Sequence, residues 1–129
     1  MTAIARMRSI VLDCPDPHSL AAFYRGLLGG AIVTDEDDWV TLSVAGRTRV
    51  AFQEAADYRP PRWPDPAHPQ QLHLDLTVDD PDLAEAQVLA IGATKAAVQP
   101  DEKHFRVFLD PAGHPFCLCV GKPEGLEDT

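Results

Sequence analysis

Two segments of the chain match each other at a constant spacing of 64 residues. Residues 9–17 read SIVLDCPDP, and residues 73–81 read HLDLTVDDP. Both segments have the pattern of a strand that ends in an Asp-Pro pair. An internal repeat of this kind indicates a fold built from two copies of one structural unit. The repeat therefore limits the chain to architectures in which a strand–helix module occurs twice.

A helix is predicted to follow each Asp-Pro pair. The aspartate can accept hydrogen bonds from the free N–H groups of the first turn, and proline suits the first helical position. Glycine ends each helical pattern, at residues 29–30 and at residue 92. Apolar residues recur at helical spacing and mark the stripes that would be buried: Leu20, Phe23, Tyr24, Leu27 and Leu28 in the first copy, and Ala84, Val88 and Ile91 in the second.

Three extended runs follow each predicted helix, separated by turn-forming residues. They cover residues 31–35, 39–44 and 48–54 in the first copy, and 94–99, 105–109 and 115–120 in the second. The order βαβββ therefore occurs twice, which predicts an α+β fold. We expect one domain over residues 1–129, with module 1 at about 4–57, a proline-rich linker at 58–70, module 2 at 71–121 and a short acidic tail at 122–129.

Alternation along the strands predicts two different faces for each sheet. One face carries the apolar residues that pack on a helix, and the other carries a mixture of polar and aromatic residues. If the two sheets curl towards each other, these second faces line a cleft for a small ligand. The residues predicted to line it are Trp39, Thr41, Gln53, His73, Asp75, Arg106, Phe108 and Cys117.

The charge balance excludes some functions. Twenty acidic and eleven basic residues give a formal net charge of −9, whereas nucleic-acid binding and attachment to anionic membranes normally need a basic surface. No run approaches the length of a membrane span, and the first residues lack a signal-peptide pattern. The three cysteines show no disulfide framework. These features favour a cytoplasmic protein that binds neither nucleic acid nor membranes.

Four motifs together carry a resemblance to a known superfamily. They are Leu12–Asp16, Phe23-Tyr24 with Leu28-Gly29, residues 73–80, and residues 110–118, which read DPAGHPFCL. With their spacing they resemble the vicinal-oxygen-chelate superfamily, which includes glyoxalases, bleomycin-resistance proteins and extradiol dioxygenases. The resemblance implies one open, U-shaped mixed sheet with helices on the outside, and a homodimer.

The same resemblance implies a divalent metal held by one residue from the first and last strand of each module. Transferred by motif, these positions are Ser9, Gln53, His73 and Cys117. Only His73 is a usual ligand of that superfamily. Since a catalytic zinc needs three good protein ligands, and hard cations prefer carboxylates, the sequence predicts a cleft without metal or other cofactor. A divalent metal remains the less favoured alternative.

Three residues could carry chemistry, and the sequence leaves their roles open. His73 fits a ligand, a general base or a hydrogen-bonding residue of the cleft. Asp75 lies on the same strand face and could orient that imidazole or raise its pKa, or it could equally be a solvated strand residue. Cys117 could be a nucleophile if a nearby cation ionised it, or an inert buried thiol.

The linker is the one compositional anomaly. Residues 58–69 read YRPPRWPDPAHP, and their five prolines prevent regular structure. Trp63 is interpreted either as packed against the core or, together with Tyr58, Arg59 and Arg62, as a wall of the ligand cleft that favours anionic compounds.

Taken together, the sequence predicts a glyoxalase-like protein that binds a small molecule of unassigned identity without the usual superfamily metal. Such a protein would either sequester a toxic compound or serve an unassigned metabolic step. The alternative is a metal-dependent lyase or dioxygenase with a degenerate site. Whether the chain is an enzyme is left open by the sequence.

Overall fold

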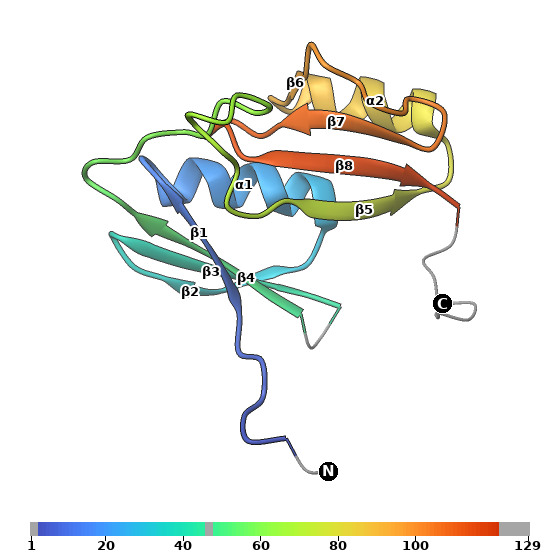
Figure 1. Cartoon of the computed structure of the whole chain (residues 1–129). Coiled ribbons are helices and arrows are strands. Elements are labelled where there is room, and N and C mark those ends of the chain that lie inside the picture. Colours follow the sequence, from blue (N-terminus) through green and yellow to red (C-terminus); the bar gives the residue numbers. More distant parts are fainter. Residues whose placement is uncertain (1–2, 46–47, 122–129) are drawn as a thin grey trace. The chain divides into compact units, whose positions relative to one another are not determined.

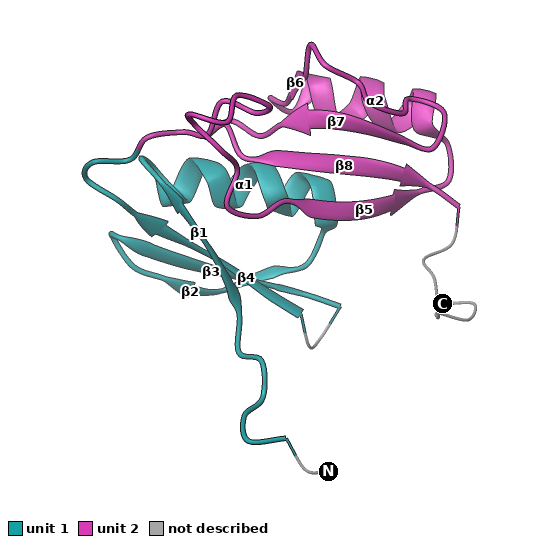
Figure 2. Ribbon diagram, in the orientation of Figure 1, with its two compact units in different colours: residues 1–58 teal, residues 59–129 magenta. Residues whose placement is uncertain are grey.

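The computed structural model describes residues 3–45 and 48–121, which form two compact units (Figures 1 and 2). The first unit comprises residues 1–58 and the second residues 59–129. The predicted acidic tail at 122–129 lies outside the described residues. No helix in the described part of the chain is long and apolar enough to cross a membrane.

The first unit contains four strands and one helix. In chain order they are β1 (Ile10–Cys14), α1 (Pro17–Leu28), β2 (Ala31–Asp35), β3 (Trp39–Val44) and β4 (Thr48–Glu54). The strands form one sheet in the order β1-β4-β3-β2, in which β1 runs parallel to β4 and the other pairs are antiparallel. These bounds confirm the predicted strands at 31–35, 39–44 and 48–54.

Helix α1 begins where the Asp-Pro pair predicts. The carboxylate of Asp16 accepts hydrogen bonds from the backbone N–H groups of His18 and Ser19, which satisfies donors that a helix otherwise leaves free. The helix buries Leu20, Phe23 and Tyr24. The ring of Tyr24 stacks on that of Phe52 in β4, with centroids 5.4 Å apart. This aromatic contact holds the helix on one face of the sheet.

Two glycines turn the chain from α1 into β2. Gly29 has a φ of 74° and Gly30 a φ of 88°, a region that residues with a side chain rarely adopt. A β-carbon at Gly30 would also collide with the backbone carbonyl of Ser43 in β3. The glycine pair therefore sets how closely the start of β2 approaches β3.

The second unit repeats this arrangement. It contains β5 (Leu74–Val78), α2 (Pro81–Ala90), β6 (Thr94–Lys95), β7 (Phe105–Leu109) and β8 (Pro115–Val120). The strand order is β5-β8-β7-β6, with β5 parallel to β8. Both units are thus βαβββ modules with the same topology, and the predicted α+β fold of two such modules is confirmed.

One predicted strand is much shorter than expected. The extended run at 94–99 forms a strand only over Thr94–Lys95, because the side chain of Gln99 takes up the backbone groups that a longer strand would use. Its amide nitrogen donates to the carbonyls of Ala96 and Val107, and its amide oxygen accepts from the N–H of Val107. The side-chain amide of Gln99 thus occupies the outer edge of β7.

Charged groups join helix α2 to its sheet. The only buried residue of the helix is Val88. The guanidinium of Arg106 in β7 donates to the carbonyl of Pro81 and forms ion pairs with Asp82 at 2.9 Å and Glu85 at 3.4 Å. Lys95 adds an ion pair to Glu85 at 3.0 Å. The second module therefore combines a helix that buries fewer of its own residues with a network of ion pairs to the sheet.

Candidate functional site

The second face of the second sheet, opposite α2, carries Asp75 and Cys117. These two residues are register partners on the neighbouring strands β5 and β8, and Val107 in β7 pairs with Cys117 on its other side. Side chains of register partners point to the same face. The face therefore combines a carboxylate, a thiol and an apolar neighbour within one row.

Arg106 and Phe108 lie on the opposite face, which corrects the expectation that they share a face with Cys117. Arg106 pairs with Leu118 and Phe108 with Phe116, and both partners point towards α2. Phe108 is fully buried, and its ring stacks on that of Phe116 with centroids 5.8 Å apart. The side chain of Arg106 points to the helix, where its guanidinium donates hydrogen bonds to the carbonyl of Pro81 and to two carboxylates.

His73 comes directly before β5 and contacts Asp75 on the same face. Its Nε2 atom lies 3.2 Å from Oδ1 of Asp75. The ligand atoms of His73, Asp75 and Cys117 all lie within 4.8 Å of one another. The structure thus brings together the three residues for which the sequence left chemical roles open. We call them the His-Asp-Cys cluster.

The thiol of Cys117 is a weak acid in this position. Burial raises its pKa to about 12, and the negative charge of Asp75 acts in the same direction, followed by Cys119. The pKa of Cys119 is also raised, again first by burial. A thiol with so high a pKa is protonated at neutral pH, and only the thiolate is strongly nucleophilic. The surroundings of Cys117 therefore do not activate it as a nucleophile.

Trp63 on the proline-rich linker packs against the same region. The cluster of buried residues formed by Ala96, Val107 and Cys117 is covered by Trp63, together with Phe105 and Cys119. The indole is half-buried. It thus contacts the core of the second module and borders the face that carries Cys117, so it combines features of both interpretations of the linker.

The second face of the first sheet contains a hollow. It has a volume of about 440 Å³ and is lined by Arg8, Ser9, Thr34, Trp39, Thr41 and Arg49. We call it the first-module hollow. The indole N–H of Trp39 donates to the hydroxyl of Thr41 at 2.9 Å. Gln53 is the register partner of Trp39 in β4 but does not line the hollow.

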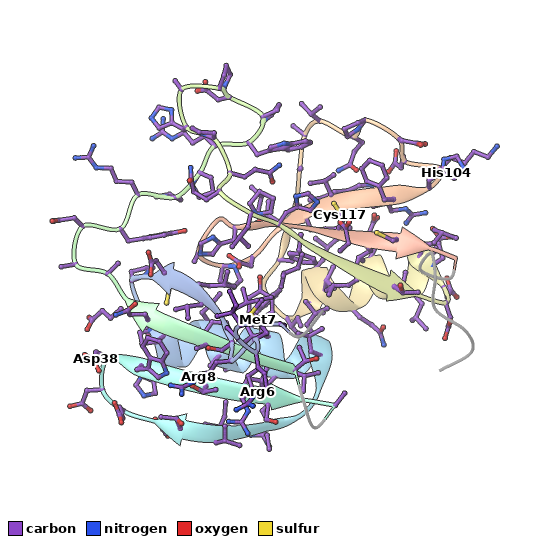
Figure 3. The ribbon with its side chains drawn as sticks, turned by 60° about the horizontal axis from the view of Figure 1, so that its bottom comes forward. Arg6, Met7, Arg8, Asp38, His104 and Cys117 are labelled. Atoms are coloured by element: carbon purple, nitrogen blue, oxygen red, sulfur yellow. The ribbon has the colours of Figure 1, made fainter. Side chains whose placement is uncertain are left out.

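Two arginines give the first-module hollow a positive charge. Both side chains are exposed, and Figure 3 shows Arg8 over the strands of the first sheet. Within residues 3–45 and 48–121, no ion pair joins Arg8 or Arg49 to an acidic side chain.

Sequence reasoning missed Arg8, Thr34 and Arg49. Alternation along β4 could have found Arg49, since it lies four residues before Gln53 and so shares its face. Alternation along β2 would have misplaced Thr34, because the pairing register with β3 shifts between Ile32 and Thr34. Arg8 precedes the first strand, where no alternation applies.

The four superfamily metal positions do not form a suitable site for a hard cation. Ser9 and Gln53 belong to the first unit, and His73 and Cys117 to the second. They offer a hydroxyl, an amide, an imidazole and a thiol whose pKa is raised to about 12, and none is a carboxylate. Since Mg²⁺, Mn²⁺ and Fe²⁺ sites of this kind depend on carboxylates, these residues do not fit the metal that the superfamily implies.

The modules, their second faces and the late DPAGHPF turn define a glyoxalase-type protein. A family model described as "Glyoxalase-like domain" matches residues 9–119. The chain therefore belongs to the glyoxalase-like domain family, within the vicinal-oxygen-chelate superfamily. A comparison with curated protein sequences gave no match.

Solved structures with the same fold come from several bacteria. The fosfomycin resistance protein FosX from Listeria monocytogenes has a TM-score of 0.70 at 18% identity, covering 95% of each chain. A glyoxalase/bleomycin resistance protein/dioxygenase family enzyme from Burkholderia phytofirmans has a TM-score of 0.69 at 16% identity, covering 90% of this chain and 98% of the other. A glyoxalase-related enzyme from Fulvimarina pelagi has a TM-score of 0.65 at 17% identity, covering 92% of this chain and 89% of the other. The chain thus shares its fold with enzymes and with a resistance protein.

Proposed function

We propose that this chain binds a small anionic molecule in the first-module hollow, without the four-residue metal site of its superfamily. The observation that carries the proposal is the lining of the hollow, which combines an indole with two arginines that have no acidic partner in the described residues. In biological terms the protein would sequester an anionic compound or act on it in an unassigned metabolic step.

The chemistry of the lining suits a phosphonate, phosphate or carboxylate attached to a small organic body. A guanidinium presents paired N–H donors that match two oxygens of such a group. The indole of Trp39 offers apolar contact area, and Ser9, Thr34 and Thr41 add hydroxyl groups around it. A volume of about 440 Å³ falls in the range of sites for small molecules.

The net charge of −9 does not oppose this reading. Exposed charges more than about 8–10 Å apart are largely screened at physiological ionic strength. A ligand in contact with Arg8 and Arg49 therefore experiences these two cations more strongly than the distant acidic side chains.

One structural relative supports the class of ligand. A variant of FosX from Listeria monocytogenes was solved with Mn(II) and 1S,2S-dihydroxypropylphosphonic acid, and it aligns with this chain at a TM-score of 0.69 and 17% identity. That ligand is a small phosphonate. The metal in that relative is the feature that we do not transfer, because the four family positions here lack carboxylates.

The proposal is tested by tryptophan fluorescence in a Trp63→Phe background, where Trp39 is the remaining tryptophan. Small phosphonates, phosphates, carboxylates and neutral analogues of matched size are titrated. We expect the anions to change the Trp39 signal saturably, and Arg49→Gln to weaken binding at least about tenfold, which corresponds to about 1.4 kcal/mol.

Arg25→Gln, which removes a cation from the exposed side of α1, is the matched control and should bind normally. Equal binding of neutral analogues, or unchanged affinity in Arg49→Gln, contradicts the proposal.

A further inference from the structure

The His-Asp-Cys cluster has a donor set that differs from the superfamily positions. Two of its members, His73 and Cys117, occupy family positions, but the third is Asp75, which does not. All three belong to the second module, whereas the superfamily site draws on both. The cluster can therefore form a site within one module, and its donors have to be judged by their own chemistry.

We infer that His73, Asp75 and Cys117 form a binding site for a thiophilic divalent cation of the Zn²⁺ type. This inference goes beyond the proposed anion-binding function and does not rest on it, because the two sites lie in different modules. It also departs from the metal-free expectation of the sequence, which considered only the four superfamily positions and so left Asp75 out.

The backbone places the three donors together. Asp75 and Cys117 are register partners on parallel neighbouring strands, so their side chains leave the same face side by side. His73 is two residues earlier and contacts Asp75, with Nε2 3.2 Å from Oδ1. All three ligand atoms lie within 4.8 Å of one another. In a tetrahedral zinc site, bond lengths of about 2.0–2.3 Å put ligand atoms roughly 3.3–3.8 Å apart. Small side-chain rotations therefore suffice to bring the donors into range.

The types of donor select the metal. Imidazole, carboxylate and thiolate are the three kinds of side chain that bind Zn²⁺ in proteins, and three protein ligands with one open position are the pattern of catalytic zinc sites. A sulfur ligand disfavours Mg²⁺ and Mn²⁺, which prefer oxygen. On binding, the cation replaces the thiol proton of Cys117, which is released to the solvent.

The cluster is open to solvent on the side of His73 and Asp75 and is bordered by apolar side chains on the side of Cys117. His73 and Asp75 are exposed, with side-chain exposures of 42% and 63%, so a hydrated cation can reach them. Cys117 is 7% exposed and packs among Ala96, Val107 and the indole of Trp63. An apolar wall around a metal strengthens its bonds to charged ligands by excluding water. Figure 3 shows Cys117 on β8.

A second histidine–aspartate pair in the same module provides a matched control. His104 contacts Asp101, with Nδ1 2.7 Å from Oδ2, but it belongs to no group of three candidate ligands in the part of the chain that the structure describes. Both pairs are exposed, and only the pair at His73 has a thiol beside it. A cation that merely associates with exposed imidazole and carboxylate groups would bind both pairs alike.

The test uses the full-length protein without an affinity tag, with Co²⁺ as a spectroscopic substitute for Zn²⁺. We expect one Co²⁺ per chain, with a near-ultraviolet absorption band from thiolate-to-cobalt charge transfer. Excess Zn²⁺ should remove the band, and equal concentrations of Mg²⁺ or Mn²⁺ should leave it. Cys117→Ser should abolish the band, and His73→Gln and Asp75→Asn should weaken Co²⁺ binding at least tenfold, whereas His104→Gln should behave as the wild type.

The outcomes separate this inference from the proposed function. His73→Gln and Asp75→Asn change exposed side chains, so their effect can be read even if Cys117→Ser fails to fold. Absence of the band in the wild type, or equal Co²⁺ affinity in His73→Gln and His104→Gln, overturns the metal site. Arg49→Gln should leave the cobalt band intact, so loss of anion binding and loss of metal binding are independent results.

Discussion

The two modules have the same topology but attach their helices in different ways. Helix α1 buries five residues, namely Pro17, Leu20, Ala21, Phe23 and Tyr24. Helix α2, two residues shorter, buries only Val88. Where Tyr24 of the first helix stacks on Phe52 of its sheet, the second module has Arg106 reaching from β7 to Asp82, Glu85 and the carbonyl of Pro81.

This difference shows that two modules can share a topology and yet be stabilised by different contacts. Burial of large aromatic side chains contributes much of the stability of a core. Ion pairs with one exposed partner contribute little, but they fix the orientation of the groups that they join. Repetition of βαβββ topology therefore does not require repetition of the helix–sheet contact, and we expect the first module to carry more of the stability.

The largest expected effect comes from removing the aromatic contact of the first module. Tyr24→Ala should lower the free energy of unfolding by about 3–5 kcal/mol, because it leaves a cavity against Phe52. Val88→Ala, at the buried position of α2, should cost about 2 kcal/mol or less. Urea unfolding followed by circular dichroism measures both. Equal costs would show that the two helices contribute alike.

A smaller effect is expected from the ion pairs of the second module. Arg106→Gln should lower the free energy of unfolding by less than Tyr24→Ala does, since it removes charge-assisted hydrogen bonds, one of which joins an 88% exposed partner, Asp82, and is weakened by solvent. Raising the salt concentration should reduce the difference from the wild type. Arg25→Gln on α1 should change stability by less than about 0.5 kcal/mol. A salt-independent cost would indicate that Arg106 acts through packing alone.

The smallest effect concerns the two helix caps. Asp16→Ala should cost about 1 kcal/mol at neutral pH. Hydrogen bonds from Ser19 lower the pKa of Asp16 below 3.8, so its contribution is present above that value and is lost as the pH falls through the folded-state pKa. Unfolding measured from pH 7 to pH 3 should show the mutant and the wild type converging. Asp80→Ala provides the comparison in α2, where no serine follows three residues later. Parallel curves for Asp16→Ala and the wild type would contradict this account.

Sequence patterns predicted the elements that depend on local chemistry. The Asp-Pro pairs marked both helix starts, because capping involves residues within one turn. Alternation found β2, β3, β4, β7 and β8 because the side-chain period of a strand is fixed by its backbone. The strand predicted over 94–99 was too long for a tertiary reason. The side-chain amide of Gln99 bonds to Val107, eight residues further along the chain, and no local pattern reveals that contact.

The candidate site was predicted less well, again for physical reasons. Along β7, each face contains at least one aromatic or apolar residue. Alternation therefore places Arg106 and Phe108 on one face and Phe105 and Val107 on the other, but it does not say which face meets the helix. The outcome follows from the register of β7 against β8, which pairs Arg106 with Leu118 and Phe108 with Phe116. Asp75 and Cys117 were placed on one face by parity alone, but their contact with each other required the register of β5 against β8.

The short strand β6 has a consequence for how this protein behaves among its own copies. An uncovered strand edge offers free N–H and C=O groups to any other extended chain, which is a common route to aggregation. On the outer edge of β7, the N–H and C=O of Val107 are already bonded to the side-chain amide of Gln99. An incoming strand finds no partner at this residue. Gln99 therefore blocks the addition of a foreign strand at this position of the β7 edge.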